Sequence, residues 1–154
     1  MKFSTREDIE APIEHVFQAI SDFDGFERSA LRRGAEVQRR ERLTEPGAEK
    51  GWDIGFEFRG KPRRIVAELT HFDAPNGLQV ATATPGIAGD LVAELVPLSR
   101  SRTRLRFSLE MRPTSLGGRL TIQSLKLAKG NLTRRFVARV AKFAIDVEDR
   151  YKKY

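Results

Sequence analysis

Apolar and polar residues alternate with a period of two through most of the middle of the chain. Residues 104–112 show it most clearly, with apolar side chains at 105, 107, 109 and 111 and polar ones between them. Residues 52–58 repeat it with an aromatic-rich apolar side. This pattern is typical of strands with one buried face, as in an antiparallel sheet. Weaker versions predict five further strands, at about 2–11, 35–43, 62–72, 78–84 and 88–97.

Helical spacing of apolar residues occurs in two regions. Pro12 is tolerated in a first helical turn, and apolar residues follow at helical spacing as far as Ile20. A second short helix is predicted from Asp22 to about Arg33, so that two helices bridge the first two strands.

The other helical region predicts one long helix from about Leu116 to Tyr151. Its apolar residues form a single stripe, consisting of Leu125, Leu132, Phe136, Val140, Phe143 and Val147. Such a stripe favours packing against the apolar face of the sheet. Gly117 and Gly118 are interpreted as a flexible connection into this helix.

The order of strand, two helices, six strands and long helix resembles the helix-grip fold of the START and birch-pollen-allergen-like superfamily, also called SRPBCC or polyketide cyclase/dehydrase-like. Residues 9–22, IEAPIEHVFQAISD, are similar to the family's opening motif of Ala-Pro, Glu and Val-Trp/Phe followed by a Ser/Thr-Asp turn. Residues 23–33 depart from the family, because many members carry a Trp-containing segment there. The resemblance covers residues 1–154 as one domain.

This resemblance implies an α+β fold in which a curved, seven-stranded antiparallel sheet wraps around the long C-terminal helix. It also implies a cavity for hydrophobic small molecules such as lipids, sterols, polyketides or quinones. The alternation within each strand predicts which side chains line it: Trp52, Ile54, Phe56, Leu91, Leu95, Leu105, Phe107 and Leu109 from the sheet, and Leu132, Phe136, Val140 and Phe143 from the helix. The alternative is that these side chains fill the core and leave no cavity.

Candidate chemistry is sparse. His71 is a weak catalytic candidate, because it continues the alternation of 65, 67 and 69 and would then point inward as a proton shuttle. The alternative is a strand-end histidine packed against a turn. His15 is expected at the surface. The sequence shows no Ser-His-Asp arrangement and no phosphate-binding glycine loop, and no cofactor is expected.

Composition narrows the function further. The 154 residues include no cysteine and two histidines, which excludes disulfides and thiolate ligands and makes a metal site unexpected. Ten phenylalanines against one tryptophan and two tyrosines favour an apolar guest. The N-terminus is charged and no apolar run approaches the roughly 20 residues of a membrane span, so a cytoplasmic location is expected.

The net charge of +7 comes from 28 basic and 21 acidic residues and is confined to residues 119–154, which hold ten basic and three acidic ones. Lys129 and Arg139 lie close enough to the apolar stripe to reach the cavity mouth and pair with an anionic ligand end. The alternative is that they extend into solvent.

Three functions fit these observations. The first is binding or transport of a hydrophobic small molecule or lipid with at most one anionic end. The second is a polyketide cyclase/dehydratase-like enzyme, which requires an inward ionisable group such as His71, Glu57, Glu94 or Glu110. The third is an interaction module that places the basic helix on an anionic membrane or partner. No nucleic-acid reading motif is present, and membrane contact is expected to be transient at most.

Overall fold

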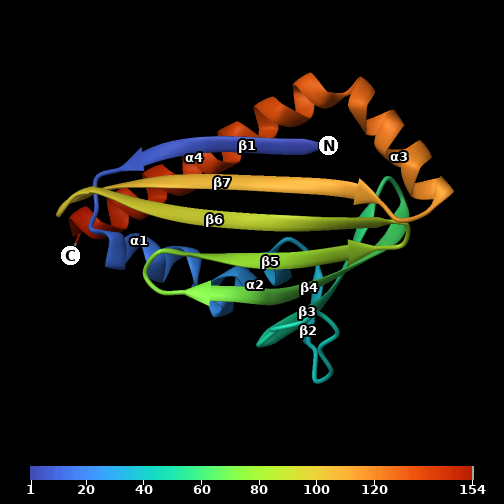
Figure 1. Ribbon diagram of the computed structural model, residues 1–154, viewed down its shortest axis with the longest axis horizontal. Coiled ribbons are helices and arrows are strands. Elements are labelled where there is room, and N and C mark those ends of the chain that lie inside the picture. Colours follow the sequence, from blue (N-terminus) through green and yellow to red (C-terminus); the bar gives the residue numbers. More distant parts are fainter. Residues whose placement is uncertain (154) are drawn as a thin grey trace.

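The computed structural model describes residues 1–153 and contains one antiparallel sheet (Figure 1). Its strands are β1 (Lys2–Ile9), β2 (Glu36–Arg39), β3 (Lys50–Phe58), β4 (Lys61–Asp73), β5 (Gly77–Thr84), β6 (Ile87–Ser99) and β7 (Arg102–Pro113). They lie in the order β1-β7-β6-β5-β4-β3-β2, so the two strands at the start of the sequence form opposite edges of the sheet. The seven-stranded sheet predicted from the alternation is confirmed.

Four helices accompany the sheet: α1 (Ile13–Ile20), α2 (Phe23–Arg32), α3 (Leu116–Leu127) and α4 (Lys129–Lys153). The two short helices between β1 and β2 are present as predicted, and α1 contacts β6, β7 and α4 while α2 contacts β2. The long α4 packs along β1, next to β7. The α+β architecture, with a long C-terminal helix on the sheet, is therefore confirmed.

The single helix predicted from 116 to 151 is wrong in one respect, because it is broken at Ala128. That residue has φ −103° and ψ 14°, and its N–H bonds to the carbonyl of Leu125, three residues back. Figure 1 shows α3 rising from the end of β7 and meeting α4 at a sharp bend. Leu125 and the apolar residues of α4 therefore belong to two differently oriented helices.

The two glycines at the start of α3 are helical, not a flexible connection. A Cβ at Gly118 would collide with the backbone carbonyl oxygen of Gly86, in the turn between β5 and β6. Gly117 has nothing nearer than the Ser115 hydroxyl at 3.9 Å. Gly118 thus lets α3 lie directly against the sheet.

The core fills one end of the space between the sheet and α4. Ile9, Val16, Leu105 and Val147 are each at most 2% exposed there. Further along the same inward faces the side chains are only half-buried. The apolar interior is therefore solid at one end and incompletely filled beside α2.

Glu68 on β4 is the buried carboxylate of this structure, at 1% exposed. It accepts hydrogen bonds from the Thr44 N–H (2.7 Å), the Thr44 hydroxyl (2.9 Å) and the Glu45 N–H (3.1 Å). Burial alone would raise the pKa of Glu68, but these hydrogen bonds outweigh it and hold that pKa below its usual value. Glu68 thereby fixes the loop between β2 and β3, where the strand predicted over 35–43 ends at Arg39.

Candidate functional site

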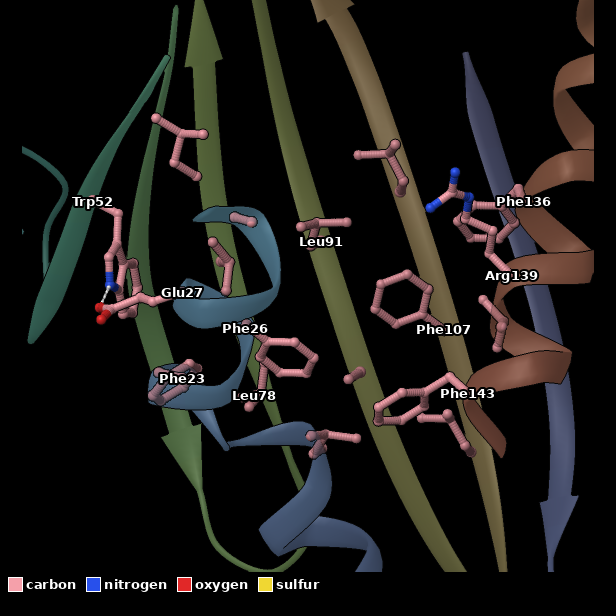
Figure 2. A pocket seen from close by; sticks show the side chains of 18 of the residues that line it. Phe23, Phe26, Glu27, Trp52, Leu78, Leu91, Phe107, Phe136, Arg139 and Phe143 are labelled. Carbon is pink, nitrogen blue, oxygen red and sulfur yellow. Dashed lines mark hydrogen bonds between the residues drawn. The ribbon is translucent and has the colours of Figure 1, made fainter. Parts of the chain in front are cut away.

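A cavity of about 620 Å³ lies between the inner face of the sheet and helices α2 and α4 (Figure 2). Its wall is almost entirely apolar, and Glu27, Arg135 and Arg139 are the charged residues that line it. The apolar wall comprises Ile20, Phe23, Phe26, Ala30, Val37, Trp52, Ile54, Leu78, Val80, Leu91, Ala93, Leu105, Phe107, Leu109, Phe136, Val140 and Phe143.

Aromatic pairs hold the walls in position. The rings of Phe107 on β7 and Phe136 on α4 stack with centroids 5.7 Å apart, which joins the sheet to α4. The ring centroids of Phe26 on α2 and Phe143 on α4 are 6.2 Å apart, so these two side chains bring the helices together across the cavity. Phe26 is 45% exposed, which places this contact at the cavity's boundary with solvent.

Helix α2 contributes one face to the wall. Asp22 caps its N-terminus by accepting a hydrogen bond from the Gly25 N–H at 3.1 Å. Phe23, Phe26, Glu27 and Ala30 then recur at the spacing of one helical face, and all four line the cavity. None of the residues of α2 is fully buried, and the ion pairs of Asp24 and Glu27 with Arg39 also join the helix to β2.

Glu27 lies at one wall in a hydrogen-bonded group. Its Oε1 accepts a 2.6 Å bond from the Trp52 indole N–H and a 2.8 Å bond from Arg39 Nε. The Arg39 guanidinium also pairs with Asp24 at 2.7 Å. The Trp52 ring is packed against Phe23 at 5.2 Å, so Glu27 fixes the orientation of the indole in the wall.

The two arginines occupy the opposite wall. Arg135 and Arg139 are one helical turn apart on α4, and Figure 2 shows Arg139 beside Phe136, across the cavity from Glu27 and Trp52. An anionic group in the cavity would be attracted to this wall and repelled by the Glu27 carboxylate. The cavity therefore has an apolar middle, with Glu27 and its partner Arg39 at one wall and two exposed arginines at the edge of the other.

Most of the side chains predicted to line the cavity lie in its wall: Trp52, Ile54, Leu91, Leu105, Phe107, Leu109, Phe136, Val140, Phe143 and Arg139. Four do not. Leu95 is 3% exposed and belongs to the solid core. Phe56 pairs with Arg63 near the far end of β3. Leu132 and Lys129 lie in the first turn of α4, next to the bend, and neither reaches the cavity.

His71 does not take the inward orientation considered for a weak catalytic candidate, because a β-bulge lies between Leu69 and His71. Leu69 pairs with Val80 and Phe72 with Leu78, so three steps along β4 match two along β5. Phe72 therefore takes the inward place, with its ring 5.2 Å from that of Phe17, and His71 is exposed.

The other candidate acids and bases also lie outside the cavity. Glu57, Glu94 and Glu110 are exposed. His15 is half-buried instead of fully at the surface, because its Nε2 donates a 3.2 Å hydrogen bond to the carbonyl of Val147 and links α1 to α4. Neither histidine lines the cavity.

Sequence reasoning missed the contribution of α2 and of Arg135. The signal for α2 was present, because residues 23, 26, 27 and 30 follow the i, i+3, i+4, i+7 pattern of a helix face. Arg135 is an exposed residue of α4, one helical turn before Arg139, and it lines the edge of the cavity.

Two further features of residues 1–153 bear on the site. No three acidic or histidine side chains in this range cluster in a way that could hold a metal ion. None of the described helices combines the length and the apolar character needed to span a bilayer.

No protein-family model and no curated protein sequence matches the chain. Several solved structures, in contrast, superpose on the chain. The Zhui aromatase/cyclase from Streptomyces sp. R1128 superposes with a TM-score of 0.70 at 13% identity, over 98% of this chain and 95% of that one. Ara h 8.0201 gives a TM-score of 0.57 at 11% identity, over 100% and 99%. PFC0360w, an HSP90 activator from Plasmodium falciparum, gives 0.51 at 19% identity, over 75% and 76%.

The first two superpose on nearly the whole chain and the third on three quarters of it, at 11–19% identity, so the likeness concerns the fold. It agrees with the opening motif at residues 9–22 and with the element order. The chain therefore has the α+β helix-grip fold of these solved structures.

Proposed function

We propose that the chain binds a hydrophobic small molecule with an anionic end in the cavity between the sheet and helices α2 and α4. The observation that carries this proposal is the apolar cavity of about 620 Å³ with two arginines on one wall. Ligand cavities of roughly 300–1,000 Å³ enclose molecules of drug or lipid-chain size. Transfer of such a molecule from water into the apolar wall supplies the main free energy of binding.

The charged groups add direction to this binding. Arg135 and Arg139 would pair with a carboxylate or phosphate, while Glu27 on the opposite wall would repel it. A ligand with one anionic end is therefore held in one orientation, with its apolar body towards Trp52.

An enzyme of the cyclase or dehydratase kind is less well supported. His71, Glu57, Glu94 and Glu110, the four groups considered as its acid or base, are all exposed. The carboxylate that does line the cavity, Glu27, is engaged by Trp52 and Arg39. The likeness to an aromatase/cyclase at 13% identity concerns the fold alone.

The test compares a filled cavity with an equal substitution on the other face of the same strand. Leu91 lines the cavity, whereas Val92 lies in a polar groove on the outer face with Lys2 and Arg6. We expect Leu91→Trp to weaken binding of a long-chain fatty acid, measured by calorimetry on delipidated protein, about tenfold or more, because the indole occupies ligand volume. Val92→Trp should leave the affinity unchanged.

A second comparison tests the anionic end. Arg139→Gln should weaken binding of the fatty acid but not of its methyl ester, because one charge-assisted contact is worth about 1.5–3 kcal/mol. Two results would contradict the proposal. The first is that the parent protein has no affinity for fatty acids, quinones or polyketides and that a solvent extract of it contains no lipid. The second is that the Leu91 and Val92 variants bind the fatty acid with equal affinity.

A further inference from the structure

Helix α3 has two apolar faces, and only one of them is covered. Gly118 and Ile122 are buried against the sheet side, with Leu125 half-buried beside them. Leu116, Leu120 and Leu127 are 74%, 59% and 91% exposed. At 100° per residue these three leucines fall within about 40° of one another, on the side of the helix opposite Ile122. These three exposed leucines, with Gln123 between Leu120 and Leu127 on the same side, are here called the leucine row.

Basic residues accompany the leucine row. Arg119 and Lys126 lie on one flank of it, about 80–100° from its centre, and Lys129 follows at the bend. Residues 111–145 contain eight basic and no acidic side chains. The surroundings of the row thus attract an anionic partner and repel a second copy of this same surface.

We propose that α3 docks on the surface of an anionic lipid bilayer, with the leucine row inserted at the boundary of headgroups and acyl chains and the basic residues on the headgroups. An apolar stripe flanked by Lys and Arg is the pattern of helices that lie in the membrane interface. A fluid lipid layer accepts separated leucines without a shaped pocket, and these leucines line neither the cavity nor the polar outer groove at Val92. Figure 1 shows α3 beside the end of the sheet, and the three leucines are exposed there.

This docking does not depend on whether the cavity holds a ligand. It uses α3 and the bend, whereas the cavity is lined by α1, α2, α4 and the sheet. A failure of membrane binding would leave the proposed cavity function untouched, and the reverse also holds.

The experiment is co-sedimentation with vesicles of phosphatidylcholine alone and of phosphatidylcholine mixed with phosphatidylglycerol. We expect binding to the mixed vesicles only, with a steep loss between about 50 and 200 mM salt, because each basic side chain near the anionic surface strengthens binding about fivefold. The double variant Leu120→Ser and Leu127→Ser should lower the partition coefficient about tenfold or more, since it keeps the charge and removes two inserted leucines.

Leu31→Ser is the matched control, because Leu31 is a 54% exposed leucine on α2, away from the row. It should leave the partition coefficient unchanged, and circular dichroism should show the same fold in all variants. Equal loss in the Leu31 variant, equal binding to neutral vesicles, or no binding to either kind would overturn the proposal. So would a dimer in sedimentation velocity that the double variant dissociates, since a second copy would then cover the row.

Discussion

Glu27 and Glu68 are both glutamates with partly or fully buried side chains, and their partners give them different roles. Glu27 lies in the cavity wall, where it orients Trp52 and leaves Oε2 outside both hydrogen bonds. All the donors to Glu68 come from the loop at Thr44 and Glu45. The Glu68 side chain lines neither the cavity nor the polar outer groove at Val92. Glu68 is therefore a structural carboxylate, and Glu27 is the one that a ligand could meet.

We expect Glu68→Gln to lower the free energy of unfolding by about 1–3 kcal/mol at neutral pH, because the loop loses charge-assisted hydrogen bonds at a buried position. The measurement is urea denaturation followed by circular dichroism. A change within error would show that the loop is fixed in some other way.

The pH dependence follows from the lowered pKa of Glu68. Its stabilising effect is fully present above the pKa of the unfolded chain, close to the ordinary value of 4.5, and is lost as the pH falls through the lower folded value. The difference in stability between parent and variant should therefore shrink only below about pH 4.5. A difference that already vanishes at pH 6 would contradict this assignment.

Individual orientations were predictable from sequence only where the strands are regular. The alternation of apolar and polar residues placed Ile54, Leu91 and Phe107 in the cavity wall correctly, because their strands pair residue for residue at these positions. The same alternation gives the wrong side for His71. The extra residue of the bulge depends on how β4 pairs with β5, and the local sequence does not show it.

At the scale of elements, the placement of α3 depends on one close backbone contact. We expect Gly118→Ala to destabilise the fold by about 1–3 kcal/mol, because the added methyl group meets the Gly86 carbonyl and α3 must move away from the sheet. Gly117→Ala is the control next to it. It should be neutral or stabilise by up to about 1 kcal/mol, since alanine favours the helix and the space is open.

Thermal unfolding of the two alanine variants provides the comparison. Equal melting temperatures would contradict the account of α3, as would a loss confined to Gly117→Ala. A lower melting temperature for Gly118→Ala alone would support it.

Element order and most boundaries could be predicted, because Pro and Gly residues and the change from period two to helical spacing mark them. The break at Ala128 is not visible in the apolar stripe, which runs on without interruption; the poor helix formers Gly130 and Asn131 directly after it are the signal that was missed. The break arises from the anchoring of α3 at Gly86 and of α4 along β1, which requires two directions. The contribution of α2 was missed for a related reason: the sequence shows that the helix has an apolar face, but not that α4 lies opposite this face.

At the scale of the whole molecule, the apolar interior is divided between a solid core and an open cavity. If the cavity binds as proposed, occupancy stabilises the folded state by about 2.7 kcal/mol at a free ligand concentration near 100 times Kd. For a chain of this length, each kcal/mol of added unfolding free energy raises the melting temperature by about 2–4 °C. Saturating fatty acid should therefore raise the melting temperature of the parent protein by about 5–10 °C.

The Leu91→Trp variant is the internal control for that measurement. Its melting temperature should respond little to the same fatty acid, because the added indole takes the ligand's place. An equal rise in both proteins would mean that the fatty acid binds elsewhere on the folded chain.

Trp52 is the single tryptophan of the sequence, and it lies in the cavity wall, 7% exposed, with its indole N–H bonded to Glu27. All indole emission of the parent protein therefore originates at one known position beside the proposed ligand. The chain carries its own optical probe, so ligand entry and exit can be followed by stopped-flow fluorescence without any label.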